Sequence, residues 1–168
     1  MNVGIVRYSV RLSLPIVLLT LMSPCDRLWA QTDPFVGSWR FVPERSRFAG
    51  TGPKDIKLRF AVETGKLREE SEVIAQNGKS LVAVNIHRYD GEEHPFELVG
   101  ETRHSKHTIR WKRIDDHTIE IRVNHDDGKE YTTERQVISP DGKELTLTHS
   151  GQRPDGTPYE SVYTFVRQ

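Results

Sequence analysis

The sequence predicts an all-β protein, an antiparallel up-and-down β-barrel of about ten strands that is preceded by a signal peptide. Two observations along residues 31-168 predict the barrel. Segments that alternate apolar and polar residues recur, as in 108-114 (TIRWKRI) and 118-124 (TIEIRVN). Turn signals such as Asp-Gly and Asn-Gly separate most of these segments at intervals of about 12 to 14 residues. A third observation, an apolar run near the N-terminus, predicts the signal peptide.

Residues 1-30 have the order of charge and hydrophobicity that is typical of a secretory signal. Two arginines precede an apolar run at 12-22, and a short polar stretch leads to Ala30, after which we place cleavage. The apolar run is about half as long as a membrane-spanning helix requires, so we expect no stable membrane span. The pattern therefore predicts a periplasmic or secreted protein whose residues 31-168 form one domain.

Composition excludes several classes of function. Lys plus Arg and Asp plus Glu number 24 each, so no strong field directs the protein to nucleic acid. Pro24 is a poor residue before a lipid-attachment cysteine, which disfavours a lipoprotein at Cys25. Cleavage after Ala30 leaves no cysteine, and with it no disulfide and no thiolate metal ligand.

The alternating segments predict where the strands lie. Every connection between them is short except residues 43-54, and that loop has room for a single helical turn. A meander without long crossovers closes most simply into an up-and-down barrel, whereas a sandwich needs Greek-key connections. We expect strands near residues 35-42, 55-63, 66-74, 80-88, 94-99, 106-114, 117-124, 129-138, 143-150 and 158-167.

Turn chemistry predicts the register of the later strands. Read as three-residue loops, Pro140-Asp141-Gly142 and Pro154-Asp155-Gly156 place Leu145 opposite both Val137 and Phe165. The same reading puts Leu147 opposite Arg135 and Tyr163. Asp126-Asp127-Gly128, read likewise, puts Ile121 opposite Thr133 and Ile119 opposite Arg135. On the early strands, a two-residue turn at Thr64-Gly65 aligns Phe60 with Glu69 and Leu58 with Ser71.

This register places two arginines on the inner face. An unpaired buried cation costs several kcal/mol, so Arg113 and Arg135 each need an acid, water or a ligand anion. Glu69 is the single inward acid that the pattern provides, which leaves a positive charge for an anionic ligand end. The alternative interpretation is that both arginines lie near the rim and reach solvent.

The start of the mature chain carries a family resemblance. Gly37-Ser38-Trp39 resembles the G-x-W of the calycin superfamily, the lipocalins and fatty-acid-binding proteins. The longer run 37-50 (GSWRFVPERSRFAG) resembles small secreted bacterial lipocalin-like proteins. The resemblance implies that Trp39 plugs one barrel end and that the barrel binds small hydrophobic molecules. The sequence departs from the fatty-acid-binding proteins in two ways. Those proteins have two helices after the first strand and an Arg-x-Tyr on the last strand, and this sequence has neither.

We therefore expect a barrel that binds a small hydrophobic or amphipathic molecule, with an anionic end favoured by the arginines, and no cofactor. Aromatic side chains supply contact and polar ones orient the ligand. The candidate ligand-binding residues are Trp39, Phe60, Glu69, Trp111, Arg113, Tyr131, Arg135, His149 and Tyr163. We expect a monomer.

The sequence gives weaker support to three other functions: protein binding, metal binding and catalysis. The rival is a protein-binding or envelope-structural barrel that uses outward Val82, Val84 and Ile86, unless those residues reflect an error in strand phase. The histidines lack the spacing of metal ligands, so we expect no metal site. His149 beside Ser161 has no third residue to orient it and no nucleophile elbow, so we expect no enzyme.

Overall fold

The computed structural model describes residues 33–96, 98–99, 107–124, 131–153 and 155–168. Gln31–Gln168 form one compact unit. The predicted signal peptide with Cys25, the predicted turn at 126–128 and the side chain of Tyr131 lie outside the described part. None of the helices described there is both long enough and apolar enough to cross a membrane.

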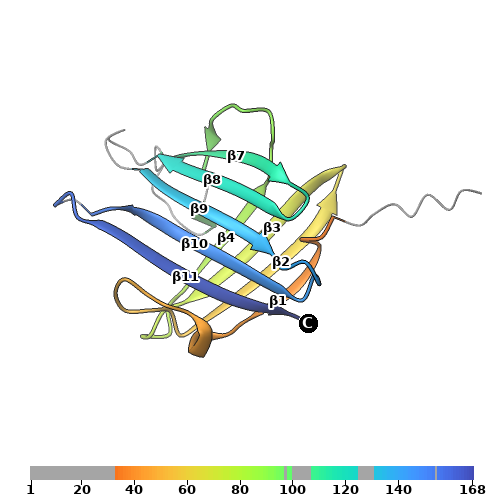
Figure 1. Ribbon diagram of the computed structural model, residues 1–168. Helices are drawn as coiled ribbons and strands as arrows, with labels where there is room; N and C mark the ends of the chain where they lie inside the picture. The colour runs from red at the N-terminus through yellow and green to blue at the C-terminus, as the bar shows by residue number, and fades with distance from the viewer. Residues whose placement is uncertain (1–32, 97, 100–106, 125–130, 154) are drawn as a thin grey trace, which may run out of the picture. The chain divides into compact units, whose positions relative to one another are not determined.

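The described strands form one antiparallel sheet of eleven strands in the order β5-β7-β8-β9-β10-β11-β1-β2-β3-β4-β6 (Figure 1). A short 3-10 helix, η1 (Pro43–Arg45), occupies the start of the loop after β1, within the single helical turn for which the sequence leaves room. The strands are β1 (Gly37–Phe41), β2 (Asp55–Glu63), β3 (Lys66–Ile74), β4 (Ser80–Ile86), β5 (His94–Pro95), β6 (Leu98–Val99), β7 (Thr108–Asp115), β8 (Thr118–Asn124), β9 (Tyr131–Ile138), β10 (Glu144–Gln152) and β11 (Pro158–Arg167).

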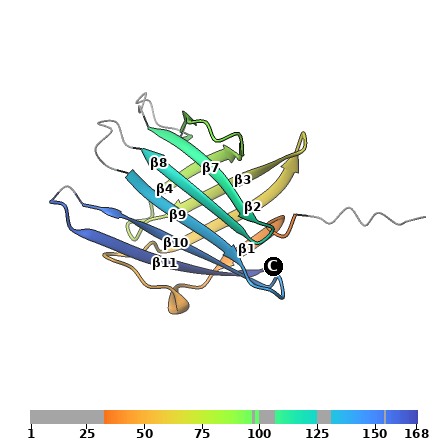
Figure 2. The same ribbon diagram turned by 45° about the horizontal axis from the view of Figure 1, so that its top comes forward.

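The predicted meander is confirmed. Consecutive strands pair from β1 to β4 and from β7 to β11, and β11 pairs with β1 to join the two runs. The strand expected at 94-99 is instead two short strands: β5 pairs with β7, and β6 pairs with β4. The sheet curls into a half-barrel (Figure 2). Its two edge strands are β5 and β6, which follow one another in the chain.

The register agrees with the prediction in two hairpins and differs in β9. Phe60 lies opposite Glu69, and Leu145 lies opposite Phe165, as expected. Leu145 lies opposite Ile138 on its other side, however, rather than opposite Val137. The Ser139 N–H donates to the Glu144 carbonyl oxygen at 2.8 Å, so the loop holds the four residues 140–143 instead of three.

This one-residue shift exchanges the faces of β9, because side chains alternate along a strand. Glu134, Gln136 and Ile138 point inward, where Thr133, Arg135 and Val137 were expected. On the neighbouring strand, Ile121 faces Glu134 and Ile119 faces Gln136. Leu147 likewise lies opposite Gln136, and it keeps its predicted partner Tyr163 on β11.

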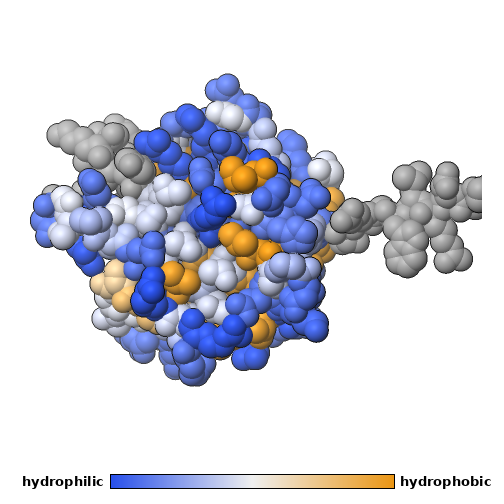
Figure 3. All heavy atoms as spheres, viewed as in Figure 1, coloured by the Kyte–Doolittle hydropathy of each residue, from blue (hydrophilic) through white to orange (hydrophobic). Residues whose placement is uncertain are grey.

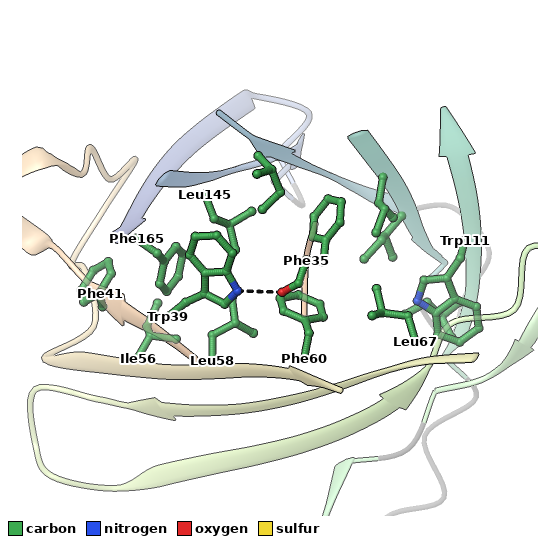
Figure 4. Packing of buried hydrophobic residues seen from close by; sticks show 14 residues of the cluster. Phe35, Trp39, Phe41, Ile56, Leu58, Phe60, Leu67, Trp111, Leu145 and Phe165 are labelled. Carbon is green, nitrogen blue, oxygen red and sulfur yellow. Dashed lines mark hydrogen bonds between the residues drawn. The ribbon is translucent and has the colours of Figure 1, made fainter. Parts of the chain in front are cut away.

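Trp39 is buried on β1, where it pairs with Leu58 on β2 and Arg167 on β11. Its buried indole Nε1 donates to the Phe35 carbonyl oxygen at 2.9 Å (Figure 4). The Arg167 guanidinium lies 4.2 Å from the centre of the Trp39 ring and donates to the backbone oxygens of Val36 and Gly142 at 2.6 Å each. A Cβ at Gly37, whose φ is +139°, would lie 2.7 Å from Arg167 Nη1, which explains the glycine there.

The outer face of β4 keeps the predicted phase. Ala83 is buried on the inner face, whereas Val82, Val84 and Ile86 are half-buried on the outer one. The phase-error interpretation is therefore wrong. The alternative, a contact patch for another protein, stays a prediction.

Candidate functional site

A cavity of about 660 Å³ lies inside the curled sheet. Residues of the loop between β1 and β2 and of the β3–β4 turn form its rim. Apolar side chains make most of its wall, and acidic and aromatic groups stand among them. The wall consists of Ile56, Leu58, Glu69, Ser71, Val73, Glu134, Leu147, His149, Tyr163 and Phe165, and the rim of Thr51, Gly52, Pro53, Ala75, Gln76 and Asn77.

Small inward residues provide this space. Ser71 on β3 lies between Leu58 on β2 and Ala83 on β4, so one row of the sheet carries two short side chains in succession. The next row along β2 and β3 carries Phe60, which packs edge to face on Phe35 with ring centres 5.6 Å apart. Close packing of large side chains fills the interior there, and the short ones leave a void beside it.

Two carboxylates lie at the cavity, joined by one amide. Gln136 Nε2 donates to Glu134 Oε1 at 2.7 Å and to Glu69 Oε2 at 3.3 Å. The Gln136 side chain is fully buried, and its Oε1 has no hydrogen-bond partner among the described residues. The amide thus spans the interior from β9 to β3, two strands that are not neighbours in the sheet.

A histidine pairs with the first of these carboxylates. His87 Nε2 lies 2.8 Å from Glu69 Oε2, and His87 Nδ1 lies 3.2 Å from the Tyr89 hydroxyl. The imidazole is buried and stacks on the Trp111 ring with centres 5.7 Å apart. Glu69 Oε2 is therefore within hydrogen-bonding distance of both the buried imidazole of His87 and the Gln136 amide.

The surroundings of Glu134 favour its neutral form. Burial and, after it, the negative charge of Glu69 raise the pKa of the Glu134 carboxyl from 4.5 to about 8, and the Gln136 hydrogen bond offsets part of that rise. Burial also raises the pKa of Tyr163, and Glu134 adds to that rise. At neutral pH Glu134 therefore holds a proton while it faces the cavity.

Three of the predicted ligand-binding residues line this cavity: Glu69, His149 and Tyr163. His149 lies directly opposite Glu134 on the neighbouring strand. Trp39, Phe60 and Trp111 belong instead to the packed core beside the cavity.

The two arginines do not reach the cavity, and the expected spare positive charge is wrong. Arg113 pairs with Asp33, with Nη1–Oδ2 and Nη2–Oδ1 distances of 2.9 and 3.3 Å. Arg135 lies exposed on the outer face of β9, with its Nη1 3.8 Å from Glu120 Oε2. Asp33 precedes the first predicted strand, so the predicted inward rows do not include it. Arg135 lies on the other face because of the register of β9.

Sequence reasoning missed the two residues that dominate the site, Glu134 and Gln136. The sequence of residues 133–138 fits a strand with either set of alternate residues facing inward, because Val137 and Ile138 are adjacent and each suits a core position. The signal that separates the phases is Ser139, whose hydroxyl accepts from the Glu144 N–H at 2.9 Å and donates to Asp141 at 2.6 Å. This pattern widens the turn by one residue.

The arrangement offers hydrogen bonding more readily than catalysis. Ser161 Oγ accepts the Ala49 N–H at 3.0 Å, which gives this hydroxyl a structural partner. In the described ranges, no three His, Cys, Asp or Glu side chains are grouped to hold a metal ion.

Comparisons with known proteins give a distant structural likeness. No protein-family model matches the sequence, and no curated protein is detectably similar to it. The crystal structure of lobster apocrustacyanin A1 superposes with a TM-score of 0.41 and 13% identity over 83% of this chain. The chain spans 63% of the length of that structure. The class of protein, an antiparallel β-sheet curled around an internal cavity, follows from the strand order and the cavity itself.

Proposed function

We propose that this protein binds a small, largely apolar molecule inside the cavity. The observation that carries the proposal is the cavity itself, whose volume of about 660 Å³ lies within the range of small-molecule sites. Apolar side chains from β2, β3, β10 and β11 line it, and a few polar groups converge at one part of the wall. That combination supports binding of a ligand with a mostly apolar body.

The polar groups argue against an anionic ligand. Lys and Arg are missing from the described lining of the cavity, whereas Glu69 and Glu134 both belong to it. A fatty-acid carboxylate placed beside them would gain no charge partner and would meet repulsion from Glu69. The apolar body of the ligand is therefore the first basis of affinity.

We further propose that residues 1-30 export the domain to the periplasm or the medium, where it acts as a monomer. The charge and hydrophobicity of that segment support export. N-terminal sequencing of the protein recovered outside the cytoplasm tests this, with Gln31 as the expected first residue. Sedimentation of that material tests the oligomeric state.

The binding proposal is tested with Nile red, an uncharged dye whose emission rises and shifts to the blue in apolar surroundings. We expect saturable binding that Ser71→Phe weakens by about tenfold or more, because the new ring occupies the cavity. The matched control is Glu72→Phe, the same substitution one residue on, at a position that faces the outside of the sheet. Equal dye binding by both variants would contradict an internal site.

A further inference from the structure

The carboxylates at the cavity bear on what kind of ligand it takes, and this inference rests on the binding function proposed above. We propose that the ligand is an amphipathic molecule with a protonated amine at its polar end, bound in the cavity by the carboxylates of Glu134 and Glu69. The ligand class is thus a hydrophobic amine rather than a fatty acid or a neutral lipid.

Geometry is the first support. Glu69 on β3 and Glu134 on β9 lie on opposite walls of the half-barrel, both line the cavity, and one Gln136 amide is within hydrogen-bonding distance of both. A donor that enters from the cavity therefore meets two carboxylates that are already held in place. Ammonium groups carry several N–H donors and no acceptor, which suits such a pair.

The buried amide is the second support. Gln136 uses both of its N–H groups on the two carboxylates, and its buried Oε1 is left without a partner in the described residues. An unsatisfied buried acceptor is unfavourable, and native proteins keep few of them. This acceptor belongs to the same cluster, and once Glu134 has lost its proton the cluster holds more acceptors than donors, a deficit that an ammonium group fills.

The titratable groups that face Glu134 come from three strands. Glu69 approaches from β3, His149 lies opposite on β10, and Tyr163 lies on β11. The contact that His87 makes in this cluster is with Glu69, at 2.8 Å. His149 is the one histidine in the described lining of the cavity.

Binding of a cation then displaces the proton of Glu134. Because the pKa of Glu134 is raised to about 8, an incoming ammonium group must expel that proton at neutral pH. The affinity for the amine is therefore expected to rise by about tenfold per pH unit below pH 8 and to level off above it. Neutral ligands of the same length should show no such dependence.

Competition among three compounds with the same tail tests the inference. Decylamine, decanol and decanoate are each titrated against bound Nile red at pH 8, below their aggregation concentrations. We expect decylamine to bind about tenfold or more tightly than decanol, and decanoate to bind most weakly. Glu134→Gln should abolish the preference for the amine and leave decanol binding within about threefold.

The matched control is Glu120→Gln, which removes a carboxylate from the exposed outer face of β8 and should keep the full preference. A second measurement uses the wild-type protein and does not depend on the folding of Glu134→Gln. It is calorimetry at pH 7 in buffers of different ionisation enthalpy. We expect release of about one proton when decylamine binds and of none when decanol binds. Decanol binding as tightly as decylamine, or an unchanged preference in Glu134→Gln, would overturn this inference alone. Failure of Nile red and all three compounds to bind would overturn the binding function as well.

Discussion

The Gln136 amide on β9 lies 3.3 Å from the Glu69 carboxylate on β3, across the interior of a sheet in which these two strands never pair. The same amide donates to Glu134, its neighbour two residues before it. One side chain therefore fixes both carboxylates and ties opposite walls of the half-barrel together. The inner surface at the cavity is acidic because of this cluster.

Replacing Gln136 with Leu should lower the free energy of unfolding by about 1 to 3 kcal/mol at pH 7, because the buried Glu69 and Glu134 lose a donor. Urea unfolding followed by tryptophan fluorescence measures the change. A loss below about 0.5 kcal/mol, the usual effect of a surface substitution, would show that water replaces the amide.

Glu134 makes stability fall as pH rises. Its pKa is raised from 4.5 to about 8 in the folded protein, so between these values the folded state holds a proton that the unfolded state has lost. The stabilisation from neutral Glu134 is full below about pH 4.5 and is lost as pH rises through about 8, with a slope of at most about 1.4 kcal/mol per pH unit.

Urea unfolding at several pH values between 5 and 9 measures this slope as a difference between the wild-type protein and Glu134→Gln. The glutamine has no proton to lose, so the difference in unfolding free energy should shift in favour of the variant as pH rises. Glu120→Gln provides the baseline for an exposed carboxylate. A constant difference across the range would mean that Glu134 titrates as an ordinary surface acid.

The two arginines that the sequence pattern treats alike should behave differently. Arg113→Met removes the two-point contact with Asp33 and the stacking on Phe35, at 5.0 Å, and should cost about 1 to 3 kcal/mol of stability. Arg135→Met removes one long, exposed contact with Glu120 and should change stability by under about 0.5 kcal/mol. Equal losses in chemical denaturation would contradict the outward placement of Arg135.

Arg167→Lys should lower the free energy of unfolding by about 1 to 3 kcal/mol, although the charge is kept. The guanidinium covers Trp39 and donates to several backbone oxygens at once, and an ammonium group has neither the planar shape nor the fork of donors. Thermal unfolding measures the loss. Arg47→Lys, at an exposed pair with Glu160, is the control that should leave the melting temperature nearly unchanged.

The hydropathy of the surface in view is consistent with a ligand-binding site inside the half-barrel. On the face shown in Figure 3, hydrophobic residues form separate small patches among hydrophilic ones. The larger apolar residues gather inside, in the cluster that contains Trp39, Phe60 and Phe165. Apolar ligands thus have more to gain from the cavity than from that face.

Much of the fold is readable from the chain because its signals are local. Alternation with period two and Asx-Gly turns predict the strands and their meander, and the pairing of Phe60 with Glu69 and of Leu145 with Phe165 follows from the shortest turns. These features depend on residues close in sequence, where turn geometry alone sets the partner.

The charge of the interior could not be predicted in the same way, because it depends on the length of one loop, to within a single residue. Four loop residues instead of three before Glu144 bring Glu134 and Gln136 inside and put Arg135 outside. The alternation of residues in β9 does not distinguish these two phases. In the packed molecule Ile138 gains a core position and Gln136 gains a contact with Glu69, on a strand far away in sequence. Long-range contacts of this kind leave no trace in local periodicity, so the wall of the cavity was predictable and the sign of its charge was not.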